Sequence, residues 1–232
     1  MTHSNLGAVL ANRLRRCLMA AAGLVIFAFG SYLQLQADIG LSPWFALNQG
    51  LSLQFPFISY GQASILFSVF FIICDLLLRE SIGLGTILNA LVIGWASDVF
   101  LALGWVPVQT NPVIQLPMLM VGIVIVCVGQ YIYMSAALSC GPRDALLVAV
   151  ARLAPKISVG KVNLALLTVA QILAILMGGP FGIGTLITIF GTGVIMDWVF
   201  HLLRFEPRNV KHENLFQTLS ALRAAARGAS HN

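Results

Sequence analysis

Long apolar runs constrain this chain more than any other feature. Runs of about 20 apolar residues alternate with short polar or Gly/Pro-containing breaks, and about 20 residues is the length that a helix needs to cross roughly 30 Å of hydrocarbon. Hydrophobic residues make up 59% of the 232 residues and charged residues only 9%, which is too little charge to cover a water-facing surface. The sequence therefore predicts an all-α membrane protein.

Six of these runs are long enough to be transmembrane helices. The first follows three arginines, as a signal peptide would, but it is about 20 residues long and lacks a small-x-small cleavage site, so we expect it to be retained. The expected spans are 17–37, 61–78, 83–104, 117–138, 161–177 and 182–203.

Two connections, 39–60 and 140–160, are too long and too apolar to be plain loops. In each we expect a helix of about a dozen residues that begins at a proline, where the missing N–H costs nothing, and ends before another proline. A helix of that length cannot cross a bilayer, so it is either re-entrant or interfacial. The first prolines are Pro43 and Pro142, and the closing prolines are Pro56 and Pro155.

The positions of Lys and Arg predict the orientation, because short loops rich in these residues stay in the cytoplasm. With a cytoplasmic N-terminus, all 13 Lys and Arg residues lie inside. An eight-span alternative would place Arg79 and Arg143 outside and Arg152 in lipid. The net charge of +5 therefore reflects membrane orientation, and no nucleic-acid partner is expected, because the cations form no patch with interleaved aromatic residues.

The two halves of the sequence resemble each other at a fixed offset of 99 residues, without a gap over about 80 positions. The matches are largely Gly, Pro, Ser and Asp, which chance apolar similarity does not supply. Each half holds three spans, so the second half must enter the membrane from the opposite face, as a 3+3 inverted repeat. Such repeats are typical of secondary transporters, with the site at the repeat interface. Matching pairs include Pro43 with Pro142, Ser59 with Ser158, Gly61 with Gly160 and Asp98 with Asp197.

The expected organisation has five parts. They are a cytoplasmic basic N-terminus (1–16), a first three-helix repeat (17–104), an external linker (105–116), a second three-helix repeat (117–204) and a cytoplasmic amphipathic tail (205–232). Within the tail, 213–227 has apolar residues at helical spacing, so we expect it to lie on the inner leaflet or to dock a partner.

The pattern predicts two matching half-sites on the substrate or ion pathway. Helix N-termini with glycine expose N–H groups that suit an anionic or carbonyl-bearing solute; the alternative for each glycine is close helix packing. Two polar residues at membrane depth, Asn89 and Gln130, are further pathway candidates. The outer half-site comprises Pro43, Trp44, Asp98, Gly182, Gly184 and Thr185, and the inner one Gly83, Gly85, Thr86, Pro142, Arg143, Asp144 and Asp197.

Acidic residues within the spans cost at least about 2.5 kcal/mol each, so they need an explanation. Asp75 lies one turn from Arg79, the spacing of a local ion pair. Asp197 is either a functional acid or the partner of a nearby arginine, Arg143 or Arg204.

Asp98 has no cation on its side of the membrane, which makes it the strongest functional candidate. Its alternatives are a protonated carboxyl group or the cap of a broken helix. We hypothesise that Asp98 and Asp197 are counterparts, engaged when the protein faces outward and inward respectively.

Motifs for other chemistry are missing from the sequence. It contains no Gly-x-Ser-x-Gly, no His-Glu-x-x-His and no P-loop. Its four cysteines show no Cys-x-x-Cys spacing, so we interpret them as core residues. No enzyme activity, catalytic residue, metal site or cofactor is expected.

Three motifs, Gly40-Leu41-Ser42-Pro43-Trp44, Ser59-Tyr60-Gly61 and Gly83-Leu84-Gly85-Thr86, resemble those of the bacterial YczE/YitT-like integral membrane proteins. The resemblance covers roughly residues 20–204. In the family pattern an Asp follows the Pro-Trp; here Phe45 stands in the first half, and the second half keeps Asp144. The resemblance implies a multi-pass protein of the bacterial inner membrane and supplies no substrate.

Together these features predict a small-solute permease that works by alternating access in the lipid bilayer. The alternative is a non-transporting membrane partner or regulator of another membrane or biosynthetic system, which would dock through the tail and through residues 143–161. A homo-oligomer or a cytoplasmic partner bound to the tail is open in either case.

The orientation is tested with a reporter enzyme that is active only in the cytoplasm. Fused near Asn111 it should be inactive, and fused near Lys156 it should be active, because the cation distribution places these positions on opposite sides. Reporter activity in whole cells is the measurement, and the reverse pattern would overturn the topology.

Overall fold

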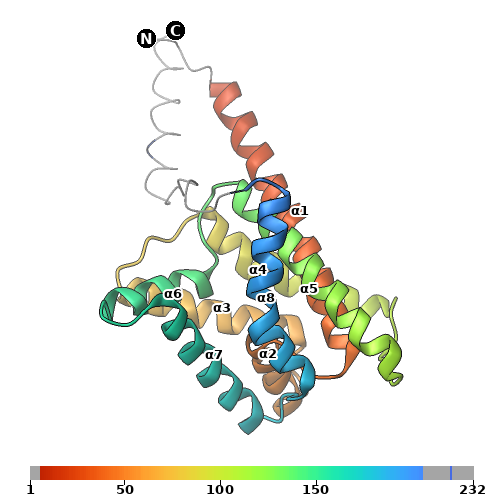
Figure 1. Ribbon diagram of the computed structural model, residues 1–232. Coiled ribbons are helices and arrows are strands. Elements are labelled where there is room, and N and C mark those ends of the chain that lie inside the picture. Colours follow the sequence, from red (N-terminus) through yellow and green to blue (C-terminus); the bar gives the residue numbers. More distant parts are fainter. Residues whose placement is uncertain (1–5, 206–219, 221–232) are drawn as a thin grey trace.

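The protein is an all-α, multi-pass membrane protein. The computed structural model describes residues 6–205 and Ser220, and the first of these ranges folds into eight helices (Figure 1). Six are long and apolar enough to span a membrane, which confirms the predicted number. They are α1 (Leu6–Ala37), α3 (Tyr60–Leu77), α4 (Leu84–Leu103), α5 (Pro112–Ser135), α7 (Val159–Leu176) and α8 (Ile183–Leu202).

Two helices begin earlier than the sequence predicts. Helix α1 starts within the expected N-terminal segment, at Leu6, and α5 starts within the expected linker, at Pro112. The start of α5 is set by Asn111, whose side chain accepts a hydrogen bond from the Val113 N–H (3.0 Å), and by Pro112 in the first helical turn. The predicted tail helix, 213–227, lies outside the described residues except for Ser220.

The two short helices have the predicted bounds and length. Helices α2 (Pro43–Gln54) and α6 (Pro142–Leu153) each begin at a proline and contain 12 residues, or about 18 Å of helix, which is too short to cross a bilayer. Ser42 occupies the N-cap position of α2, but its side chain makes no capping hydrogen bond. Both helices therefore start because proline favours the first turn, not because a side chain caps them.

Helix boundaries repeat along the chain at the offset seen in the sequence. The first and last residues of α2, α3 and α4 each lie 99 positions before those of α6, α7 and α8. The offset thus holds at both ends of all three pairs of helices, and not only at matching side chains.

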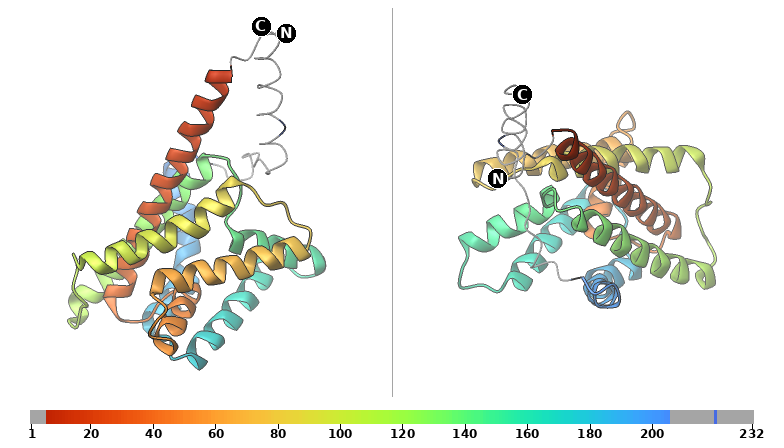
Figure 2. Two further views of the ribbon diagram at one scale, coloured as in Figure 1. Left: turned by 180° about the vertical axis from the view of Figure 1, so that it is seen from behind. Right: turned by 90° about the horizontal axis from the view of Figure 1, so that it is seen from above.

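Helices α1 and α5 run side by side through the middle of the molecule, with α4 and α8 on opposite sides of the pair (Figure 2). Their backbones touch at two pairs of glycines, Gly23 with Gly129 and Gly30 with Gly122. A Cβ atom on Gly129 would lie 2.5 Å from the Phe27 backbone nitrogen. Small residues of this kind allow membrane helices to approach closely.

Large apolar side chains cover the outer faces of the spans. Leu77 and Val113 are each 78% exposed, and Phe190 is 69% exposed. Within the protein itself these side chains have little to pack against, so lipid must cover them. The lipid contact that the composition predicts is therefore visible in the fold.

The contact between α1 and α5 can be tested with a single methyl group. Gly129→Ala should lower the free energy of unfolding in detergent by about 1–3 kcal/mol, and with it the melting temperature, because the methyl group overlaps the α1 backbone. Gly160→Ala is the matched control, since no atom lies within 4 Å of its added Cβ. Equal melting temperatures for the two variants would contradict the close approach.

Candidate functional site

A cavity of about 160 Å³ lies at the centre of the helices. Its wall includes Trp44 from α2, Asn89 from α4, Gln130 from α5, and Arg143 and Asp144 from α6. The sequence predicted all five as pathway residues but divided them between two half-sites and the spans. Trp44 and Arg143, expected on opposite sides of the membrane, in fact share one cavity.

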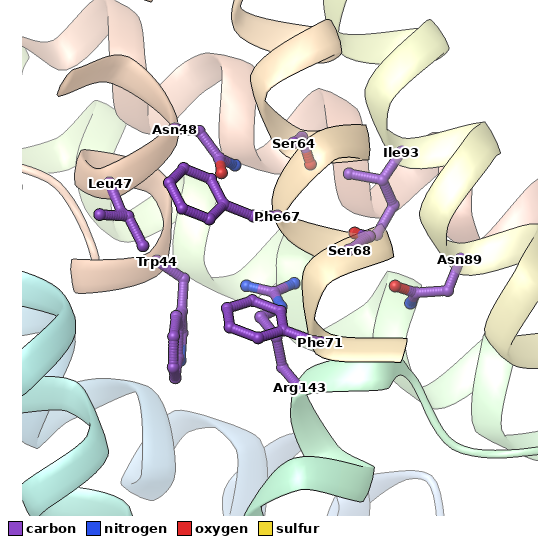
Figure 3. Close-up of a pocket in the computed structure, with 10 residues that line it drawn as sticks. All are labelled: Trp44, Leu47, Asn48, Ser64, Phe67, Ser68, Phe71, Asn89, Ile93 and Arg143. Carbon is purple, nitrogen blue, oxygen red and sulfur yellow. The ribbon is translucent and has the colours of Figure 1, made fainter. Parts of the chain in front are cut away.

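The charged group of this central cavity is Arg143. Its side chain extends from α6 into the space between α2 and α3, with the Asn89 amide directed toward it (Figure 3). The guanidinium carbon lies 5.9 Å from the centre of the Phe27 ring and 5.8 Å from that of Phe45, within the range of cation–π attraction. No side chain in the described part of the chain forms a salt bridge with Arg143.

Burial lowers the pKa of the Arg143 guanidinium from its ordinary value, and the nearby charge of Asp144 opposes that shift. An arginine nevertheless stays protonated at neutral pH. Arg143 therefore contributes a fixed positive charge to a cavity whose wall also includes Asp144.

Residues from the central parts of three spans reach the cavity or the small pocket beside it. Phe27, Val126 and Phe67 come from the central parts of α1, α5 and α3 and lie at the wall of the central cavity or of a small adjoining pocket that also contains Arg143.

Residues 99 positions apart meet in the wall of the central cavity. Four such pairs line it, which is the arrangement expected where two related halves face each other. The pairs are Phe27 with Val126, Ser42 with Gly141, Trp44 with Arg143, and Phe45 with Asp144.

A wider cavity of about 670 Å³ lies between α5, α6 and α8. Its wall includes Asp197 and His201 as well as Gln130 and Asp144, which also line the central cavity. The Gln130 Nε2 atom donates to Asp144 Oδ2 at 3.4 Å. Gln130 and Asp144 therefore stand where the two cavities meet.

Asp98 lies away from both cavities and caps α3. It accepts hydrogen bonds from the Ser59 hydroxyl group and from the Gly61 N–H, the latter at 2.7 Å. Helices α3 and α4 are so close here that a side chain on Gly61 would overlap the Gly94 carbonyl oxygen. These contacts are those of a helix-capping residue, the alternative considered for Asp98. The prediction that Asp98 lies in one half-site with Trp44 is wrong.

The equivalent residues of the second half make none of these contacts. Asp197 and Ser158 are exposed, and the Ser158 side chain makes no capping hydrogen bond. Within the described residues, Asp197 forms no salt bridge with Arg143 or Arg204. The ion pair considered for Asp197 is therefore not present.

The glycines at the starts of α4 and α8 serve close packing. The Gly85 N–H donates to the Leu138 carbonyl (3.4 Å), and the Gly184 N–H donates to the Ile39 carbonyl (2.7 Å). The start of α4 is thus hydrogen-bonded to the segment that follows α5, and the start of α8 to the segment that follows α1. Thr86 and Thr185 are buried there, next to Gly83 and Gly182, whose N–H groups bond to the threonine hydroxyls at 3.3 Å. These N–H groups are occupied by protein and do not face a solute.

Asp75 does not form the expected ion pair with Arg79. Its side chain is fully buried, and neither carboxylate oxygen has a hydrogen-bond partner among the described residues. Arg79 is exposed, with a backbone φ of 61° that turns the chain at the end of α3. The helix ends before the two side chains can pair. Arg152 instead ties the end of α3 to α6, through Glu80 (2.9 Å) and the Leu78 carbonyl (2.8 Å).

The four cysteines are free thiols. Cys140 lies in the wall of the wider cavity, and burial raises its pKa to about 11. The thiol is therefore protonated at neutral pH and a weak nucleophile.

Sequence reasoning missed several residues near Arg143. Asn48, Ser64 and Phe71 line the small adjoining pocket (Figure 3). Asn48 lies four residues after Trp44 on a short helix, so the two share a helix face, and this spacing could have indicated Asn48. Ser64 and Phe71 carry no comparable signal, because they resemble ordinary packing residues of a span.

The chain is similar to a family of membrane proteins. The model of a family of unknown function, DUF6198, matches residues 14–201. The chain belongs to this family. It is 32% identical over 178 residues to the uncharacterized membrane protein YczE of Bacillus subtilis, covering 75% of this chain and 80% of that protein. This confirms the resemblance to YczE-like proteins.

Two further relatives carry no functional description. An uncharacterized protein of Haemophilus influenzae is 27% identical and covers 79% of this chain and 83% of its own length. Uncharacterized protein YyaS of Bacillus subtilis is 29% identical, covering 75% and 87% respectively. No solved structure matches the chain.

The different roles of the two aspartates can be measured. Ser59→Ala and Asp98→Asn should each lower the free energy of unfolding by about 1–2 kcal/mol, because each removes hydrogen bonds at the start of α3. The equivalent changes Ser158→Ala and Asp197→Asn should leave thermal unfolding in detergent nearly unchanged. Similar losses in both pairs would contradict the asymmetry of the two halves.

Proposed function

We propose that this protein is a small-solute permease built as a 3+3 inverted repeat and working by alternating access. The matching helix boundaries, the offset of 99 residues and the odd number of spans in each half support the inversion. The central cavity supports transport, since paired residues of the two halves line it.

The observation that carries the proposal is a difference between equivalent helix pairs. Helix α3 packs tightly on α4 at Gly61 and Gly94, whereas nothing lies within 4 Å of a Cβ built on Gly160 or Gly193, the equivalent glycines of α7 and α8. Two halves with matching helices thus hold one pair closed and the other open. This is the asymmetry that a transporter shows when it is open to one side.

The opposite state follows by exchanging the two arrangements. Helix α7 would close on α8, with Ser158 and Asp197 taking the places of Ser59 and Asp98, while α3 would leave α4. The wider cavity, which Asp197 lines, would then shut. With cytoplasmic termini, the structure corresponds to the inward-facing state, and Asp98 and Asp197 hold the outer and inner gates in turn.

Thiol crosslinking in vesicles tests this exchange. In a chain whose four native cysteines are replaced by alanine, one variant carries Ser59→Cys with Asp98→Cys and another carries Ser158→Cys with Asp197→Cys. A short bis-methanethiosulfonate reagent should crosslink both pairs, because each pair is together in one of the two states. Mobility on denaturing gels measures the yield.

Gly160→Ala provides a matched control. Its methyl group would overlap the Gly193 carbonyl in the closed arrangement, as one on Gly61 overlaps Gly94. The crosslink between positions 158 and 197 should therefore fall, while that between 59 and 98 should persist. If positions 158 and 197 never crosslink although both thiols react with maleimide, alternating access is wrong and the non-transporting membrane partner is favoured.

A further inference from the structure

We infer that the central cavity binds a small monocarboxylate, with the carboxylate on the Arg143 guanidinium and the rest of the solute between the aromatic and amide side chains around it. This inference deepens the proposed function, because it names the class of solute, but binding itself does not depend on transport.

The charge of Arg143 is the first argument. A cation at membrane depth is costly unless something neutralises it, and no described side chain forms a salt bridge with this one. Asp144 follows it on α6, and consecutive side chains leave a helix about 100° apart. The aromatic rings of Phe27 and Phe45 offset part of the cost. The Asp144 charge acts on Arg143 through space, but a bound anion would contact the guanidinium directly.

The number of charges favours a monocarboxylate. One guanidinium balances one negative charge, and the nearby Asp144 would repel a second. A dianion such as hydrogen phosphate would therefore keep an unbalanced charge in an apolar surrounding. The planar fork of arginine also fits the two oxygens of a carboxylate.

The walls suit a solute with a short apolar body and a hydroxyl group. Trp44 packs edge-on against Phe71, with ring centres 5.4 Å apart, next to Arg143. Asn89 and Gln34 are both more than nine-tenths buried in the cavity wall. The Gln34 Oε1 atom has no hydrogen-bond partner among the described residues and almost no exposed surface, so it would accept a hydrogen bond from a bound hydroxyl group once its side chain turns toward the cavity. A volume of about 160 Å³ limits the solute to a few heavy atoms.

Lactate is the probe that these features select. Purified full-length protein in detergent is incubated with radiolabelled lactate, and saturable binding is measured by scintillation proximity. Unlabelled lactate should displace the label; lactamide, which has the same shape without the charge, and inorganic phosphate should not.

Variants then assign the site. Arg143→Gln should raise the Kd for lactate by about 10- to 100-fold, because it removes the charged half of a bidentate contact. Arg143→Lys keeps the charge without the fork and should lose less, and Asn89→Leu should weaken binding several-fold. Arg152→Gln is the matched control, because Arg152 bonds to Glu80 and Leu78 outside the cavity, and it should bind as the parent does.

The outcomes separate this inference from the proposed function. Absence of saturable lactate binding to folded protein, phosphate displacement, or equal binding by a folded Arg143→Gln variant would overturn the carboxylate site. If Arg143→Gln does not fold, Arg143→Lys and Asn89→Leu decide in the same way. Lactate binding without uptake into vesicles would leave the site standing and overturn the permease, whereas crosslinking at both gates without lactate binding would overturn only the carboxylate site.

Discussion

The close approach of α1 and α5 is the contact on which the rest of the structure depends. Two pairs of glycines let the backbones touch, and a single methyl group at any of the four would meet backbone or side-chain atoms of the other helix. Because membrane helices gain little from burying apolar surface, such close van der Waals contact is a main source of their association. Two other spans pack on this pair, α4 against α1 and α8 against α5, while α3 packs on α4, and α7 on the short helices α2 and α6.

The cavity at the centre depends on the two short helices. Helices α2 and α6 are too short to cross a bilayer, and they pack against α3 and α7. The first turns of α2 and α6 bring Trp44 and Arg143 into one space.

Several predictions from the sequence are wrong about which groups the side chains and backbone N–H groups contact. The glycine motifs at the starts of α4 and α8 indicated exposed N–H groups, but Ile39 and Leu138 from the other half occupy two of these groups. Asp98 was placed beside Trp44, although it caps α3. Spacing along a helix does not reveal which element of the opposite half will pack against it.

The sequence by itself determined the six spans, the two short helices and the offset that relates the halves, because hydrophobic length, proline positions and repeat spacing are local properties of the chain. The tertiary structure alone decided that Trp44 and Arg143 share a cavity and that α3 closes on α4 while α7 stays apart from α8. The two halves have the same residue types at these positions, so their sequences cannot distinguish the helix pair in close contact from the pair that is apart. The packing of one half against the other makes that choice.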